Sequence, residues 1–163
     1  MRLRKRRLSG DRGSVLALVP AGFLVLIALG ALAVDSAVAY QGQQQLHDTL
    51  VAAANDAASS AIDHSAFYGS GSVVISLPVA QQVVCRSLVQ QHDSQLHQVK
   101  LWLGVNGAEL RVMGEAKVDA VFGRAIPGFG TRHVRAVVDA VAATAPGQQP
   151  GSPPPTLAPL PCS

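Results

Sequence analysis

The hydrophobic pattern of the chain begins with one uninterrupted apolar run. No charged residue lies between Arg12 and Asp35, and residues 14–34 are mostly Leu, Val, Ala and Ile. A helix rises about 1.5 Å per residue and the hydrocarbon core of a bilayer is about 30 Å thick, so about 20 apolar residues span it. A buried core helix of this length normally carries a polar stripe, which this run lacks. The sequence therefore predicts a transmembrane helix at 14–34.

Residues 36–63 keep helical character with a different pattern. Small and apolar residues recur at spacings of three, four and seven, and Gln and Asp occupy positions between them. The recurring residues are Ala39, Leu46, Leu50, Ala53, Ala57 and Ala61. This spacing is typical of an amphipathic helix, and only Gly42 interrupts it. We therefore predict one continuous helix over 14–62, roughly 70 Å long, with half of it in lipid and half outside.

Shorter elements follow, several of them with the period of two that is typical of strands. They are a turn at 68–72, a strand at 73–77, a helix from Pro78, a hairpin around Asn106-Gly107, a helical turn at 121–126 and a strand at 134–142. This order predicts an α+β fold, in which the long helix packs on a small antiparallel sheet of about four strands with a second helix.

The C-terminal segment differs in composition from the rest. Seven of the 18 residues from Pro146 onward are proline, and such a segment buries little apolar surface. We expect four parts: a basic cytoplasmic segment at 1–13, the transmembrane helix at 14–34, an extracytoplasmic domain at 35–145 and a disordered tail at 146–163.

The charge distribution predicts the orientation of the chain in the membrane. Six Lys and Arg residues precede the apolar run, and none lies in the ten residues after Asp35. The positive-inside rule places the N-terminus in the cytoplasm and residues 36–163 outside. The sequence pI of about 9.2 therefore describes the N-terminal tip. Without a basic stripe interleaved with aromatic residues, we expect no nucleic-acid partner.

A cleavable signal peptide is the alternative interpretation of the same segment. Ala37-Val38-Ala39 matches the small-residue cleavage pattern, and a basic region precedes the apolar run. The apolar run is longer than the 7–15 residues or so of a signal peptide, which favours the anchor. Cleavage after Ala39 remains open at this point.

The apolar run also has a face of small residues. Ala17, Ala21, Ala28 and Ala31 lie on one side of the helix. Small residues allow helices to approach closely in lipid, so this face is a candidate helix-packing surface. The alternative is that alanine is simply abundant in this chain.

The sequence contains no motif for catalysis, a cofactor or a metal. There is no P-loop, no dinucleotide fingerprint, no nucleophile elbow and no C-x-x-C. His92, Asp93 and His97 are neighbours, but a metal site needs more ligands, so we interpret them as a polar helix end and strand start. We therefore expect a protein that is not an enzyme and has no cofactor.

Cys85 and Cys162 are the only cysteines, and both are expected outside the membrane. An oxidising compartment permits a disulfide between them. Free thiols, or a bond from Cys162 to another molecule, are the alternatives. The sequence gives no distance between the two Cα atoms that would decide.

Several segments resemble TadE/TadG-like proteins, the pseudopilin-like components of tight-adherence (Flp) pilus assembly, with the closest likeness to actinobacterial versions. These segments are 11–15, the apolar run, 33–37, 43–46, 52–58 and 134–142. The resemblance covers residues 11–144 and implies a pilin-like fold. It also makes Gly13 and Ser14 candidate processing residues. Prepilin-like substrates carry a glutamate at the fifth position after cleavage, where this chain has Leu18, so an uncleaved anchor suits the sequence better.

The resemblance implies a membrane-anchored structural or assembly component of a Flp (Tad) pilus or related secretion system. Its expected partners are the membrane and other Tad-type assembly proteins or pilin-like helices. The alternative function is a secreted or surface binding module, released by cleavage after Ala39. A cell-envelope hydrolase ranks last, because no motif supports it.

Overall fold

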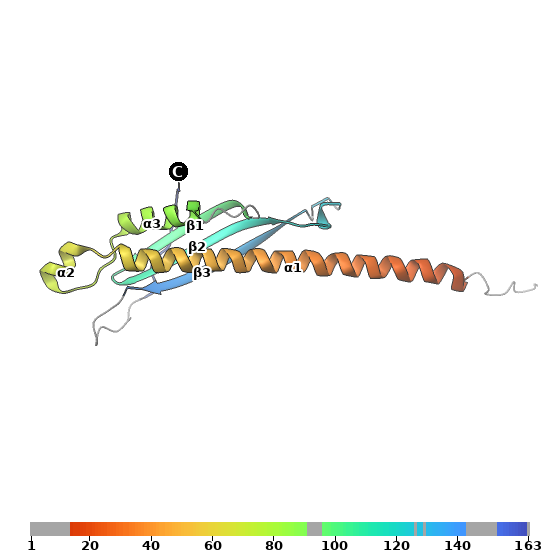
Figure 1. The fold of residues 1–163 in the computed structure, drawn as a ribbon, viewed down its shortest axis with the longest axis horizontal. Coiled ribbons are helices and arrows are strands. Elements are labelled where there is room, and N and C mark those ends of the chain that lie inside the picture. The colour runs from red at the N-terminus through yellow and green to blue at the C-terminus, as the bar shows by residue number, and fades with distance from the viewer. Residues whose placement is uncertain (1–13, 91–95, 126, 129, 143–152, 163) are drawn as a thin grey trace, which may run out of the picture.

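The computed structural model describes residues 14–90, 96–125, 127–128, 130–142 and 153–162. It has an α+β fold in which helices cover one face of a four-stranded antiparallel sheet (Figure 1). The predicted fold class, with a long N-terminal helix on a small antiparallel sheet and a second helix, is confirmed. The arrangement is consistent with a pilin-like fold.

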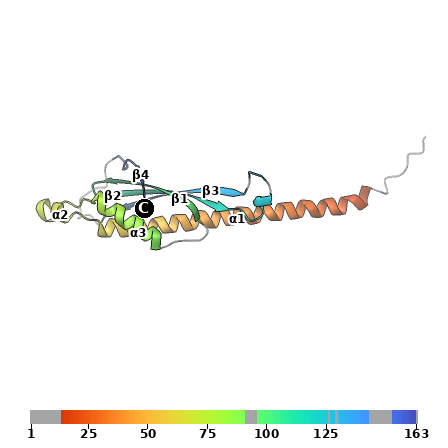
Figure 2. The same cartoon turned by 90° about the horizontal axis from the view of Figure 1, so that it is seen from above.

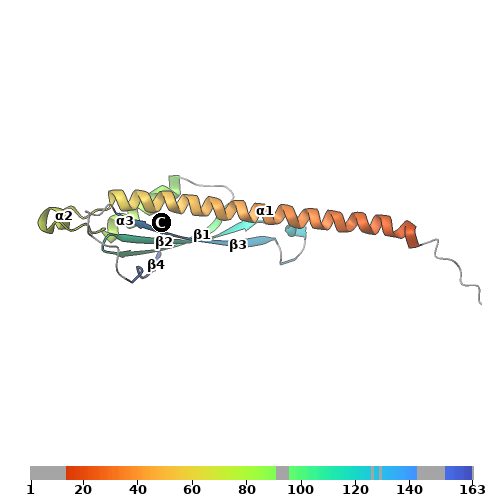
Figure 3. The ribbon, with the colours of Figure 1, turned by 90° about the horizontal axis from the view of Figure 1, so that it is seen from below.

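Helix α1 (Ser14–Ser60) is a single helix of 47 residues, close to the predicted 14–62. It includes Pro20, which the first turns of the helix accommodate without a break. Its first half extends well beyond the sheet, whereas its second half lies along the sheet (Figures 1 and 3). The same helix therefore has two different surroundings along its length.

The sheet has the strand order β3-β2-β1-β4. Strands β1 (Leu96–Asn106) and β2 (Glu109–Asp119) form the hairpin predicted around Asn106-Gly107, where Gly107 has a φ of 61°. A residue without a Cβ adopts this left-handed conformation at little cost. Strand β3 (Thr131–Val141) pairs with β2 along its whole length, and β4 (Ala158–Leu160) pairs with β1.

The core lies between the sheet and two helices, α1 and α3 (Leu77–Gln90) (Figure 2). Small residues dominate the part that α1 contributes, and branched residues dominate the part from the sheet. Its members include Leu46, Leu50, Ala53, Ala57, Val84, Leu110, Val112, Val118, Val134 and Val138. The alternation seen in the sequence of β3 points Val134, Ala136, Val138 and Ala140 inward, as expected for a half-buried strand.

Two glycines let α1 approach the sheet closely. A Cβ on Gly42 would lie 2.5 Å from Cγ2 of Val118, and one on Gly114 would lie 3.0 Å from Cδ1 of Leu50. Val118 is buried and β-branched, so it has little freedom to move away. The glycine that interrupts the helical pattern in the sequence thus serves helix–sheet packing.

The predicted strand at 73–77 is wrong. Only Ile75 pairs, in a single bridge to Ile62. The backbone hydrogen bonds of this segment connect it to several elements. Ile75 N–H donates to Gly107 O, Ser76 N–H donates to Ala61 O, and Asp63 N–H donates to Val74 O. The segment therefore ties the end of α1 to the β1–β2 turn. The predicted turn at 68–72 instead ends a short helix, α2 (His64–Ser70), which Asp63 caps at its N-terminus.

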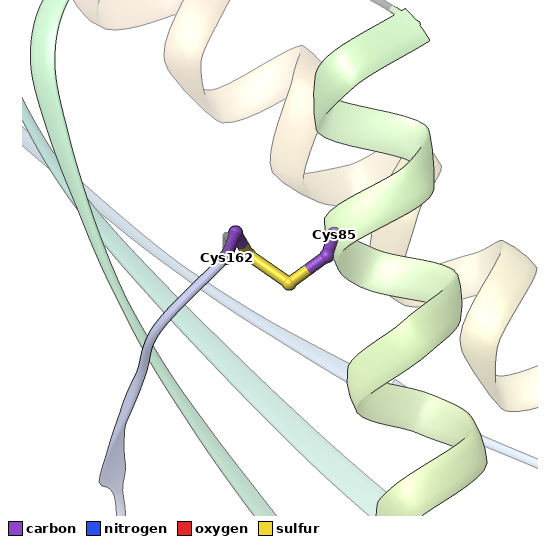
Figure 4. The surroundings of a disulfide bond; sticks show 2 residues. All are labelled: Cys85 and Cys162. Carbon is purple, nitrogen blue, oxygen red and sulfur yellow. A yellow bond between two sulfur atoms is a disulfide. The ribbon is translucent and has the colours of Figure 1, made fainter.

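The prediction of a disordered tail at 146–163 is wrong for residues 153–162, which the structure describes; residues 146–152 and 163 lie outside the described ones. Leu160 pairs with Leu101, and Pro155 is buried where Gly104 leaves room on β1. A disulfide joins Cys162 to Cys85 on α3, with a Cα–Cα distance of 5.4 Å (Figure 4). Of the alternatives for the two cysteines, the structure contains the intramolecular bridge. Strand β4 thereby replaces the strand expected at 73–77.

We expect Gly42→Ala to lower the free energy of unfolding by about 1 kcal/mol, because overpacking against Val118 outweighs the helix preference of Ala. The measurement is chemical denaturation of the full chain in detergent micelles. Gly69→Ala on α2 is the control, because nothing lies within 4 Å of its added Cβ. A Gly42→Ala variant as stable as the wild type would contradict the close approach.

We expect the double substitution of Cys85→Ser and Cys162→Ser to lower the free energy of unfolding by about 2–4 kcal/mol, as for a disulfide that closes a long loop. The bridge spans 77 residues of sequence. Adding a reductant to the wild type should produce the same loss in denaturation experiments and should leave the double variant unchanged. Equal stability of reduced and oxidised wild type would show that the bridge does not stabilise the fold.

Candidate functional site

The most unusual polar group of the structure lies where the apolar half of α1 meets the sheet. Asp35 is the first residue after the predicted span, and it is only 7% exposed. The neighbouring residues Val34 and Ser36 on the same helix are exposed. A buried carboxylate requires hydrogen-bond partners, because burial otherwise removes its water without compensation.

Three backbone N–H groups supply these partners. Val121 and Phe122 donate to Oδ1 of Asp35 at 2.8 and 2.9 Å, and Gly123 donates to Oδ2 at 2.7 Å. All three belong to the connection between β2 and β3, where the one-turn 3₁₀ helix η1 (Gly123–Ala125) begins. Successive N–H groups that point at one anion form a concave anion site, here filled by a side chain of the same protein.

The local chain path explains why these N–H groups are available. Ala120 N–H donates to Gly130 O and closes the connection just beyond the strands, and Ala125 N–H donates to Phe122 O. The N–H groups of Val121, Phe122 and Gly123 therefore face α1, beside which η1 lies (Figures 2 and 3). The helix and the loop are 86 to 88 residues apart in sequence at these contacts.

The hydrogen bonds also set the charge of the site. The N–H of Phe122, together with those of Gly123 and Val121, holds the pKa of Asp35 below its usual range, and the positive charge of Arg132 acts in the same direction. Removal from water opposes these effects. Because hydrogen bonds to the charged form favour that form, Asp35 is a carboxylate at neutral pH.

An apolar crevice adjoins the clamp that Asp35 forms with residues 121–123. It has a volume of about 240 Å³ and is lined by Ala28, Ala31, Leu32, Asp35, Phe122, Gly123 and Arg132. Val121 and Phe122 are 56% and 51% exposed, although the clamp holds their backbone firmly. The loop therefore presents apolar side chains beside the outer end of the apolar run.

The candidate alanine face lies on the line of α1 that faces the sheet. Asp35 is 7 residues after Ala28 and 18 residues after Ala17, which are about two and five helical turns. Gly42, on the same line, meets Val118. Ala31 is partly buried, Ala21 and Ala28 are exposed, and the side chain of Ala17 lies outside the described part. Ser14 is the first residue of α1, and Gly13 lies outside the described residues.

The remaining polar candidates are scattered. His97 lies 3.6 Å from Asp119 and His47 lies 3.5 Å from Asp48, both at the surface. His92 and Asp93 lie outside the described residues. Among the described residues, no group of three His, Cys, Asp or Glu side chains is placed to hold a metal ion. The arrangement at Asp35 can hold a loop on a helix, but no nucleophile or base of the described residues hydrogen-bonds to its carboxylate.

The distal end of the molecule has a second distinct surface. The carboxylate of Asp63 accepts from the N–H groups of Ser65 and Ala66 and so begins α2. Phe67 and Tyr68 of α2 pack edge to face, and Tyr68 is 82% exposed. This aromatic tip lies at the opposite end of the sheet from the connection between β2 and β3, to which Asp35 bonds (Figure 1).

Sequence reasoning used Asp35 as the end of the apolar run and as a member of segment 33–37, and it missed the contact of Asp35 with the loop. The available signal was a single acidic residue inside a continuous helical pattern, placed between apolar turns. Its partners are backbone N–H groups of a loop, which have no sequence signature. Such a contact becomes visible only when the fold brings the loop to the helix.

Comparisons of the chain with protein-family models, with curated proteins and with solved structures found no match. The fold and the site therefore define only a class. It is an α+β protein with one long helix whose N-terminal part is long and apolar enough to span a membrane, as a transmembrane or a signal helix would be.

We expect Asp35→Ala to free the loop, because three N–H groups lose their acceptor. Amide hydrogen exchange of Val121, Phe122 and Gly123 in the full chain should become at least roughly tenfold faster, as local opening no longer breaks charged hydrogen bonds. Asp35→Asn, which keeps one acceptor oxygen, should have a smaller effect. Ser36→Ala is the control, because its hydroxyl bonds only to Leu32 O of the same helix. Unchanged exchange in Asp35→Ala would refute the clamp.

Proposed function

We propose that this protein is a membrane-anchored, pilin-like structural or assembly component of a Flp (Tad) pilus or a related secretion system. The observation that carries the proposal is the continuity of α1. One helix of 47 residues contains both the apolar segment and the central element of the folded domain. Any force or contact at one half is therefore transmitted to the other through helical backbone.

The surface of the apolar half supports an anchor in lipid. Leu18, Phe23 and Leu29, for example, are each more than half exposed, although water solvates such side chains poorly. Exposed apolar surface of this extent marks a site of association or of membrane contact. Its length suits a bilayer, and the basic residues of 1–13 favour a cytoplasmic N-terminus.

The likeness to TadE/TadG-like proteins gives this anchor its specific role. The segments that carry it include both ends of the apolar run, and Asp35 lies within 33–37. The proposed partners are other Tad-type proteins or pilin-like helices in the membrane. Because the alanine face continues the sheet-facing line of α1, a helix packed on Ala21 lies on the same side of α1 as the sheet. Partner helices would then pack beneath the folded domain.

Release as a secreted binding module is the alternative, supported by the Ala37-Val38-Ala39 pattern. Cleavage after Ala39 would remove Asp35 and leave the N–H groups of residues 121–123 without their acceptor. It would also separate the domain from the preceding helix at a point where Val38 and Ala39 are partly buried. Cleavage between Gly13 and Ser14, by contrast, would leave the whole of α1 in place. These consequences favour the anchored form.

We expect the protein to stay in the membrane with its C-terminus outside, because the apolar run is retained and its basic flank stays in the cytoplasm. Carbonate extraction tests integration, protease shaving of intact cells tests orientation, and N-terminal sequencing tests processing. A mature chain that starts at Met1 or Ser14 agrees with the proposal. A soluble chain that starts at Tyr40 would support the secreted module instead.

We expect Ala21→Leu to weaken association with neighbouring helices while preserving insertion, because larger side chains on a small-residue face separate the backbones. Crosslinking to Tad-type neighbours at matched expression is the measurement. Ala28→Leu should act similarly, although Ala28 also lines the crevice. Leu26→Ala, on the opposite side of the helix, is the control. Equal crosslinking of all four proteins would leave the alanine face without a role in association.

A further inference from the structure

The surface around the clamp combines features that a protein in water would avoid. Val121 and Phe122 are about half exposed, and the crevice beneath them is lined by Ala28, Ala31 and Leu32 of the apolar run. This exposed apolar surface is continuous with the apolar half of α1. The distances from Asp35 to residues 121–123 fix the loop at this level of the helix.

We propose that this surface is a phospholipid-binding site: the side chains of Val121 and Phe122 enter the outer leaflet, and the crevice takes an acyl chain. The inference rests on the proposed membrane anchoring. It adds that the folded domain itself contacts the bilayer, at the first turn of α1 beyond the span. The domain would therefore rest on the membrane rather than swing freely above it.

The depth of the loop argues for lipid as the occupant. Asp35 follows the last residue of the span directly, so a loop hydrogen-bonded to Asp35 lies at the boundary between hydrocarbon and headgroups. Three lining residues of the crevice belong to the apolar run itself, so under the proposed anchoring the crevice opens at the level of the hydrocarbon. Aromatic side chains favour this boundary region.

The charges beside the crevice fit a phosphate. Arg132 lines the crevice and is exposed, and Arg124 of η1 is exposed as well while it pairs with Asp119. Long cationic side chains place their apolar stems along hydrocarbon and their charges at the headgroups. The carboxylate of Asp35 does not repel a phosphate strongly, because three N–H groups surround its oxygens. We therefore expect Arg132 to contact the phosphate of an anionic lipid.

The experiment measures how deeply the loop lies in a bilayer. The full chain carrying Phe122→Trp is reconstituted in vesicles whose lipids bear a fluorescence quencher at a shallow or a deep position of the acyl chain. The wild type, whose single tryptophan is Trp102 in the middle of β1, gives the background. Leu26→Trp reports on the span, and Tyr68→Trp reports on the distal tip.

The expected result is strong quenching of the Phe122→Trp variant by the shallow quencher, which places the new ring roughly 5–10 Å into the boundary region. Leu26→Trp should be quenched most by the deep quencher, and Tyr68→Trp should remain at background. Adding Arg132→Glu to Phe122→Trp should reduce the shallow quenching in vesicles that contain phosphatidylglycerol. It should have little effect in vesicles of phosphatidylcholine alone.

Three other outcomes separate this inference from the proposed anchor. If Leu26→Trp is quenched but Phe122→Trp stays at background, the chain spans the bilayer and the lipid site is refuted. If the emission of Phe122→Trp shifts to the blue without quenching, a protein surface such as a second copy covers the loop, which also overturns the inference. If Leu26→Trp is not quenched, the anchor itself fails.

Discussion

One continuous helix combines an exposed apolar half with a half that packs on the sheet, and the remaining structure depends on this constraint. The first half of α1 exposes apolar side chains around its circumference, whereas the second half buries a narrow line of Leu, Ala and Gly against the sheet. Because no turn separates the halves, the orientation of the sheet is fixed relative to the apolar segment. The small residues on the sheet-facing line permit the close approach, and most large core side chains come from the strands and α3.

Asp35 adds a tertiary contact between α1 and the sheet to the continuity of the helix. The carboxylate of Asp35, at the boundary between the halves, binds the loop that connects β2 to β3. The sheet is therefore held to α1 at a point N-terminal to the residues of α1 that pack in the core. Hydrogen bonds to an ionised group are stronger than those between neutral groups, and here three of them converge. The domain thereby reaches to the end of the apolar run, where an assembly component would meet both the bilayer and neighbouring helices.

Elements with local signals were predictable from the sequence, and elements that depend on distant partners were not. The apolar run, the Asn106-Gly107 turn and the alternation in β3 each report on their own residues. The sheet has four strands, as expected, but one of them is a different segment: β4 is a strand, and residues 73–77 are not. Strand β4 was not predicted because its segment is rich in proline. The segment is held on the sheet by close packing of Pro155 against Gly104 and by the disulfide at Cys162. The partners of Asp35 left no pattern at all.

The central claim is that α1 is one rigid helix from its apolar half into the folded domain. Spin labels at exposed positions Leu24 and Asn55, which are 31 residues apart, measure it directly in the full chain in lipid nanodiscs. A continuous helix predicts a narrow distance distribution centred on about 46 Å between the backbones, at about 1.5 Å per residue. A broad distribution, or one centred well below this distance, would place a hinge between the apolar half and the domain and would contradict the account.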